Sequence, residues 1–205
     1  MSPAYSGGIR GNLILSERAN FDLAVRLRRE GASLAEVFTF ISGLYFRGKV
    51  AYAQAFASGP AGIPGALIIT AGRGLVPLDT RVTIQELQQI AAVPVDATEP
   101  RYREPLERDA RALAERAGPE CDIILLGSIA TAKYLEPLVD IFGDRLLFPS
   151  DFVGRGDMGR GGLMLRSARD GVELSYAPAT STARRGPRAA NLPRIRPNKI
   201  QRDSV

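Results

Sequence analysis

The stretch Asp122-Ile-Ile-Leu-Leu-Gly-Ser128 decides the fold class of this chain. Its four consecutive apolar residues, Ile123 to Leu126, are too few for an ordinary helix and lack the polar alternation of a half-buried strand. Such a run is typical of a central strand in a parallel sheet, which is buried on both faces. Gly127-Ser128 then begins a helical segment that ends at Phe142-Gly143. A buried strand followed by a helix predicts an α/β fold.

Two further buried strands are predicted, at Ala66–Thr70 and at Arg145–Phe148. Helices are expected between the strands. Ser33–Glu36 and Thr83–Glu86 have the capping-box pattern, a Ser or Thr followed three residues later by Glu, which marks a helix start. Apolar residues recur with the helical period between Glu104 and Ala117. This order of elements indicates a three-layer sandwich with a mostly parallel sheet.

The C-terminal part is predicted to add a hairpin and an arm. Leu163–Arg166 and Val172–Tyr176 alternate in polarity on either side of Arg169-Asp-Gly171, and Asp-Gly is a frequent hairpin turn. Residues 1–182 are therefore expected to form one α/β domain that ends in a β-hairpin. Residues 183–205 are rich in proline and arginine and are expected to form an extended basic arm.

The excess positive charge of the chain lies in that arm. The chain has 27 Lys and Arg residues against 22 Asp and Glu residues, a net charge of +5. Residues 183–205 hold 7 of the basic residues and 1 acid, which leaves 20 basic and 21 acidic residues in the domain. An arm of this kind predicts contacts with RNA or DNA phosphates, contacts with another subunit of a homo-oligomer, or a solubilising tail. The candidate phosphate contacts in the arm are Arg184, Arg185, Arg188, Arg194, Arg196 and Lys199.

Missing residue types exclude several classes of chemistry. The chain has no histidine and a single cysteine, Cys121, so neither a Ser-His-Asp nor a Cys-His mechanism can operate within it. No metal site or cofactor is predicted, because the zinc-ligand pattern and the Walker and dinucleotide fingerprints are absent. The lone cysteine and the lack of an apolar leader indicate a cytoplasmic protein. No apolar run approaches the roughly 20 residues of a membrane span, so no membrane partner is expected.

Three segments that follow predicted strands are candidates for a ligand site, because ligands of open α/β sheets bind beyond the carboxyl ends of the strands. They are Gly72-Arg73-Gly74, Gly127-Ser128 and the glycine-rich residues 150–162. Glycines let a ligand approach the backbone, and arginines offer two-pronged contacts to phosphate. The predicted ligand-binding residues are Arg73, Gly74, Gly127, Ser128, Arg155, Arg160 and Tyr45.

Two carboxylates in residues 150–162, Asp151 and Asp157, are the candidate catalytic groups. Either could act as a general base, and the alternative for both is a salt bridge to a neighbouring arginine. Tyr45 lies with Arg47 and Lys49 in a polar and aromatic group at a helix start. It could stack on a substrate or simply pack on the core.

Three segments together form a pattern. It has Leu-Tyr before a helix in Phe40–Tyr52, Thr-Ala-x-x-Gly-Leu-Val at a strand end in Ile68–Pro77, and a glycine turn after another strand in Leu125–Ser128. This pattern resembles a group of uncharacterised bacterial α/β proteins. That group is similar to the peroxide-stress protein of enteric bacteria and to glycosylase-like domains that handle nucleobases. The Cys-Ser-x-x-Lys motif that is usual there is absent from this chain. The resemblance implies a nucleotide or nucleic-acid ligand and no particular reaction.

The sequence thus predicts an α/β protein that interacts with a nucleotide or a nucleic acid. As an enzyme it would act at an N-glycosidic bond, because a carboxylate can position water while an arginine holds a phosphate. One alternative is a non-catalytic protein that binds RNA, DNA or a ribonucleoprotein through its arm. The other is a structural homo-oligomer whose subunits are joined by the arm.

Overall fold

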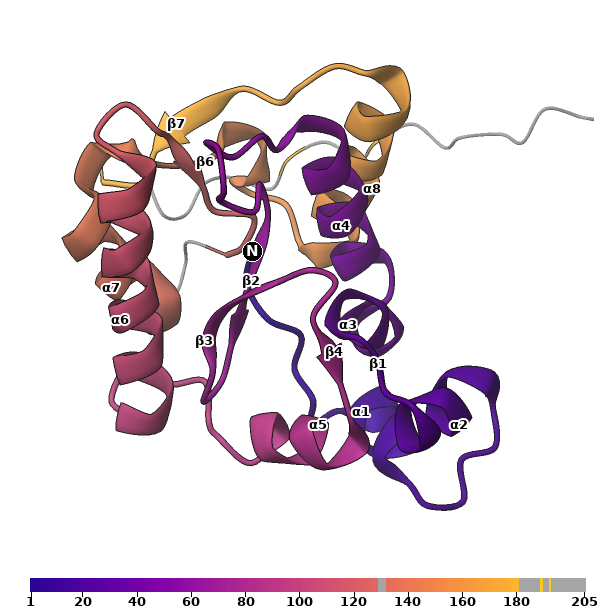
Figure 1. The fold of residues 1–205 in the computed structure, drawn as a ribbon. Helices are drawn as coiled ribbons and strands as arrows, with labels where there is room; N and C mark the ends of the chain where they lie inside the picture. Colours follow the sequence, from indigo (N-terminus) through magenta and orange to yellow (C-terminus); the bar gives the residue numbers. More distant parts are fainter. Residues whose placement is uncertain (129–131, 181–188, 190–191, 193–205) are drawn as a thin grey trace, which may run out of the picture.

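The computed structural model describes residues 1–128, 132–180, 189 and 192, and shows a mixed α/β fold (Figure 1). The helices are α1 (Ile9–Leu15), α2 (Asp22–Arg29), α3 (Leu34–Ser42), α4 (Leu44–Phe56), α5 (Ile84–Ala91), α6 (Pro100–Ala117), α7 (Ala132–Phe142) and α8 (Asp157–Asp170). The strands are β1 (Ala32–Ser33), β2 (Leu67–Thr70), β3 (Gly74–Pro77), β4 (Arg81–Val82), β5 (Ile123–Ile124), β6 (Leu146–Pro149) and β7 (Tyr176–Pro178). Short 3-10 turns are η1 (Gly143–Arg145) and η2 (Ser150–Phe152). In the part of the chain just defined, no helix is long and apolar enough to cross a membrane.

The strands pair in small sheets of mixed type. β5 runs parallel to β6, whereas β1 with β4, β2 with β3, and β6 with β7 pair antiparallel. The strands expected near residues 66–70, 122–126 and 145–148 are present as β2, β5 and β6. Residues 74–77 form a further strand, β3, for which no strand was predicted. Gly72 and Gly74 have φ angles of 78° and 72°, which allow the tight turn that folds β3 back on β2.

Residues 1–2 lie between β2 and the end of β5. The Met1 nitrogen donates to Leu67 O at 2.6 Å, and Ile69 N donates to Met1 O at 3.0 Å. Met1 thus bonds the two residues that flank Ile68, and this is the hydrogen-bond pattern of parallel strands. On the other side, Ser2 N donates to Leu126 O at 3.1 Å. This short segment therefore connects the edge of β2 to the edge of β5.

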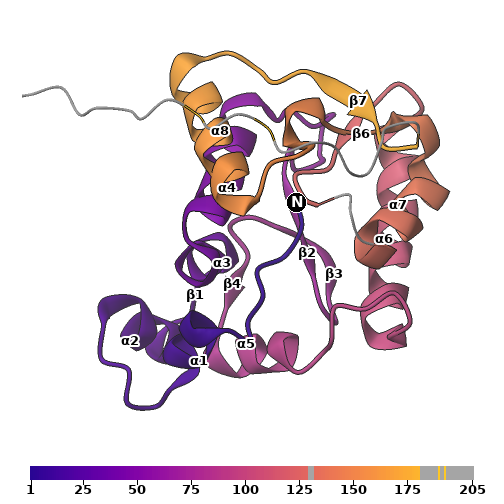
Figure 2. The same cartoon turned by 180° about the vertical axis from the view of Figure 1, so that it is seen from behind.

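Helices cover the strands from two sides. α6 and α7 lie on one side, and α4 and α8 lie on the other, in both views (Figures 1 and 2). The core between them contains fully buried aromatic and aliphatic side chains, among them Phe46 of α4, Ile68 of β2, Tyr102 and Leu106 of α6, and Phe148 of β6. The burial of such side chains is the main favourable term in folding.

The predicted C-terminal β-hairpin is wrong. Residues 163–166 belong to α8, and Gly171 ends that helix in the left-handed conformation with φ 67° and ψ 21°. The Asp170-Gly171 pair is thus a helix C-cap rather than a hairpin turn. The buried residues of α8 are Gly161, Met164 and Ser167, which recur every three residues along one face. That face packs on α4, so a contact with a distant helix stabilises residues 163–166 as a helix rather than a strand.

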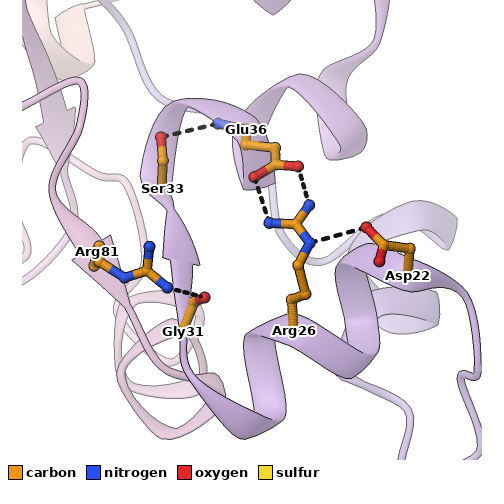
Figure 3. Close-up of polar contacts among 6 residues, drawn as sticks. All are labelled: Asp22, Arg26, Gly31, Ser33, Glu36 and Arg81. Atoms are coloured by element: carbon orange, nitrogen blue, oxygen red, sulfur yellow. Dashed lines mark hydrogen bonds and ion pairs between the residues drawn. The ribbon is translucent and has the colours of Figure 1, made fainter.

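The two predicted capping boxes differ in completeness. At the start of α5, Thr83 and Glu86 bond each other's backbone nitrogens reciprocally. At the start of α3, Ser33 Oγ accepts from Glu36 N at 3.4 Å, but the Glu36 carboxylate turns away to accept two bonds from Arg26 of α2 (Figure 3). A charge-assisted, two-pronged contact of this kind is stronger than a bond to a backbone amide. Glu36 therefore joins α2 to α3.

Candidate anion-binding site

The candidate site begins at a close crossing of α4 and α8. Gly48 and Gly161 meet there, and a Cβ atom added to Gly48 would lie 2.7 Å from Gly161 O. A Cβ atom added to Gly161 would lie 2.7 Å from Leu44 O. Because neither residue has a side chain, the two backbones can touch. The crossing brings together polar side chains on the adjoining turns, Tyr45 and Lys49 of α4 with Asp157 and Arg160 of α8.

Lys49 is buried, and no carboxylate of the described residues contacts it. The residue is only 1% exposed. Its Nζ donates to Ser2 Oγ at 2.7 Å and to Ser2 O at 3.1 Å. Nζ also lies 4.1 Å from the centre of the Tyr45 ring. Burial lowers the pKa of Lys49 to about 7, with Asp157 raising it and Arg160 lowering it further. Near neutral pH the amine is therefore present in both protonation states.

Arg160 supplies a second largely buried cation next to Tyr45. Its side chain is 13% exposed, its Nε donates to Phe152 O at 3.2 Å, and its Nη1 lies 3.7 Å from Asp157 Oδ1. The Asp157 side chain is 68% exposed, so water screens its charge. The site thus contains Lys49 and Arg160 against a single carboxylate that mostly faces solvent.

The Tyr45 hydroxyl is buried and is unpaired within the described residues. Tyr45 is 7% exposed, and its Oη forms no hydrogen bond of good geometry with a described residue, although the Arg160 guanidinium lies close to it. Burial raises the pKa of Tyr45, and the nearby Arg160 guanidinium acts in the opposite direction. A buried hydroxyl without a partner is unfavourable, because it has lost its bonds to water. Tyr45 is therefore ready to bond a further group.

The N-terminus of α8 adds backbone donors to the site. The N-cap residue is Gly156, so no side chain caps the first turn. The first N–H groups of a helix have no partner within it, and the helix dipole favours negative charge at this end. Residues at this end reach the surface, since Met158 is 69% exposed. The start of α8 therefore reaches solvent, whereas Tyr45, Lys49 and most of Arg160 are buried.

Gly127 and Ser128, which follow β5, form a wall beside Ser2. A Cβ atom on Gly127 would lie 2.9 Å from Ser2 Cβ and 3.3 Å from the Tyr134 ring, so only glycine fits against this wall. Ser128 N donates to Tyr134 Oη at 3.2 Å. Tyr102, on α6, has a fully buried hydroxyl that also lacks a partner in the described structure. Ser2 connects this wall to Lys49.

Three of the predicted site residues, Tyr45, Asp157 and Arg160, meet in this cluster. Gly127 adjoins it through Ser2, and Ser128 follows Gly127 and bonds Tyr134. The sequence prediction did not assign Lys49 or Tyr102 to the site. Lys49 carried a usable signal, because it follows Tyr45 by four residues and so shares its face of the helix. Nothing in the sequence distinguishes Tyr102 from an ordinary core residue.

Two other predicted residues, Arg73 and Gly74, lie elsewhere. Arg73 pairs with Glu86 at 2.7 Å and lines a separate cleft of about 580 Å³ with Arg101 and Arg108. Gly74 has a structural role, because a Cβ atom there would lie 2.1 Å from an oxygen of the Asp109 carboxylate. The turn between β2 and β3 thus packs on α6 and contributes nothing to the cluster around Lys49.

Arg155 and Asp151 bond within their own loop. Arg155 Nε donates to Asp151 O at 2.9 Å, and the Asp151 side chain is exposed. The salt bridge considered for Asp157 is present as its contact with Arg160. The arm residues Arg184, Arg185, Arg188, Arg194, Arg196 and Lys199 lie outside the described residues.

Comparison with models of known protein families, with curated proteins and with solved structures found no match for this chain. Within the described ranges, no group of three or more Cys, Asp or Glu side chains is placed to hold a metal ion.

Proposed function

We propose that the protein binds a phosphate-bearing ligand, a nucleotide or the phosphate of a nucleic acid, at the cluster of Tyr45, Lys49 and Arg160. The observation that carries this proposal is the pair of largely buried cations beside an unpaired buried hydroxyl. Lys49 bonds only neutral groups of Ser2, and Arg160 faces one carboxylate that is mostly exposed, so a bound anion would stabilise both charges. A phosphate group can accept bonds from all three side chains and from the first amides of α8.

The site also offers a route to chemistry at an N-glycosidic bond. Asp157 lies at the exposed edge of the cluster and could position or deprotonate a water molecule, while Arg160 holds the phosphate. Lys49, with a pKa of about 7, could donate a proton to a departing base or take one up. Asp157→Asn would then abolish the release of free base from a nucleotide, with ligand binding retained. Chromatography of the reaction mixture measures this release.

Ligand binding is tested by titration calorimetry with a nucleoside 5′-monophosphate, inorganic pyrophosphate and the unphosphorylated nucleoside. We expect the two phosphate compounds to bind and the nucleoside not to. Tyr45→Phe and Arg160→Gln should each weaken binding about tenfold or more, as loss of a hydrogen bond to a charged group does.

Two features of these variants separate a binding role from a structural one. Tyr45→Phe removes a hydroxyl that has no partner in the described structure, so the melting temperature should hold or rise while affinity falls. The matched control is Arg169→Gln, an exposed arginine at the far end of α8. Unchanged affinity in both Tyr45→Phe and Arg160→Gln would remove the proposal.

We also propose a three-layer architecture for the domain and a cytoplasmic location. We place the cluster at the carboxyl edge of a mostly parallel sheet in a three-layer sandwich, which is where open α/β sheets bind ligands. The parallel pairing of β5 with β6, and of residues 1–2 with β2, supports this arrangement. The single cysteine favours the cytoplasm as the compartment.

A further inference from the structure

An apolar slot separates β2 from β5. It is a cleft of about 360 Å³ that begins at Met1 and continues away from Ser2, between the facing edges of the two strands. Helices close it on both faces, α4 on one side and α6 and α7 on the other (Figures 1 and 2). Its lining includes Ala53, Phe56, Leu67, Leu113, Ile124 and Leu138.

Both strand edges turn backbone hydrogen-bonding groups toward this slot. Leu125 N donates to Leu147 O at 2.8 Å, and Ile123 lies opposite Leu146. Because backbone groups alternate sides along a strand, the N–H and C=O of Ile124 face away from β6 and into the slot. On the other edge, Leu67 O already accepts from Met1, so the N–H of Leu67 points the same way.

The slot is one strand wide. Residues 1–2 bridge it at one end, with Met1 bonded to Leu67 and Ile69 of β2 and with Ser2 bonded to Leu126. Neighbouring strands in a sheet are about 4.8 Å apart, so the gap that these two residues span is that of a single inserted strand. Buried backbone groups are almost always paired, and buried apolar walls are almost always in contact. An unfilled slot meets neither condition.

We propose that the slot is a strand-binding site, and that its occupant is an extended, uncharged segment joined to the Met1 nitrogen and parallel to β2 and β5. Such a segment continues the ladder that residues 1–2 begin, and it merges two sheets into one with the order β3, β2, inserted strand, β5, β6, β7. The Met1 nitrogen supports a covalent junction. Its ammonium is buried beside Lys49, and burial lowers its pKa to about 5, whereas an amide N–H donates the same bond without a charge.

The experiment compares two full-length chains with N-terminal extensions of about five residues, the usual length of a strand. One extension consists of Val, Ile and Thr, and the other of Gly and Ser. We expect the first to raise the melting temperature by several degrees and to slow hydrogen exchange at the Leu67 and Ile124 amides at least tenfold. The second should change neither quantity, because it has no side chains to fill the slot and little strand propensity.

Ala53→Leu provides an independent check, because Ala53 lines the slot and is 6% exposed. A larger side chain there competes with the inserted strand, so the gain from the Val, Ile and Thr extension should shrink in this variant. Equal effects of the two extensions, or unprotected Leu67 and Ile124 amides in the stabilised chain, would overturn the proposal.

Discussion

At the scale of single residues, Lys49 is the most unusual group in the protein. It places a potential charge in the core, with a serine and an aromatic ring as its direct partners. The groups that face it are the Met1 amine, Tyr45, Asp157 and Arg160, so one carboxylate and one guanidinium act on its charge in opposite directions. A buried lysine lowers the stability of the folded chain. Residues with pKa values shifted in this way cluster at functional sites.

The stability of the protein should therefore depend on pH through Lys49. The pKa of this amine is about 7 in the folded chain against a reference value of 10.5, so the unfolded chain binds the extra proton between these values. Stability then rises with pH across this window, by up to about 1.4 kcal/mol per pH unit, and the penalty is complete below pH 7. Lys49→Met should abolish this rise in chemical denaturation between pH 8 and 9, above the range in which the Met1 amine contributes.

Lys133→Met is the matched control, because Lys133 is exposed. It should leave the pH dependence of the wild type intact. Parallel pH profiles for the wild type and Lys49→Met would show that the buried amine keeps its ordinary charge.

At the scale of elements, the crossing of α4 and α8 determines the site. Gly48 and Gly161 allow a backbone approach that no other residue permits, and the polar side chains meet as a consequence. The sequence showed the glycines of residues 150–162 and suggested that they let a ligand approach the backbone. In the structure, Gly161 serves the approach of another helix. Local composition cannot separate these two uses, because the partner of α8 lies more than a hundred residues away in the chain.

Gly161→Ala should separate the helices and destabilise the protein by about 1–3 kcal/mol, as overpacking does. Gly159→Ala lies in the same helix, where the added Cβ atom would meet only the Arg155 side chain at 3.7 Å. That control should raise stability by up to about 1 kcal/mol through helix propensity. Thermal and urea unfolding measure both variants. A neutral Gly161→Ala would mean that the helices do not touch at this point.

At the scale of the whole molecule, charge is separated along the sequence. Residues 183–205 carry seven basic residues against one acid, and the rest of the chain is close to neutral. Electrostatic attraction to a polyanion is therefore a property of the arm, whereas the cluster around Lys49 is a local feature of the domain. The two can be tested separately.

Removal of residues 183–205 should abolish the salt-dependent part of binding to single- or double-stranded nucleic acid and leave nucleotide binding at the Lys49 cluster unchanged. In the full-length chain the logarithm of affinity should fall with the logarithm of salt concentration, with a slope of about −6 if every basic residue of the arm contacts a phosphate. Fluorescence anisotropy measures both effects, and light scattering of the same two chains detects a change in oligomeric state. Retained salt-dependent binding by the truncated chain, or affinity of the full-length chain insensitive to salt, would assign the contact to the domain.

The sequence by itself determined the elements whose signals are local. The buried strands at β2, β5 and β6 follow from short apolar runs, and α3, α5 and α6 follow from their N-terminal residues and helical periodicity. The sequence also placed Tyr45, Ser128 and Arg160 among the site residues. The predictions of these strands and helices hold because propensity and capping act within a few residues.

Only the tertiary structure decided the features that depend on distant partners. Residues 163–166 have the apolar character of a strand, yet contact with α4 makes them helical. Lys49 resembles a surface lysine in the sequence, but Ser2 and the α8 helix enclose it. The slot between β2 and β5 is defined by two edges more than fifty residues apart. Strand pairing, and the enclosure of a polar side chain by distant segments, depend on contacts between segments, and no local pattern encodes them.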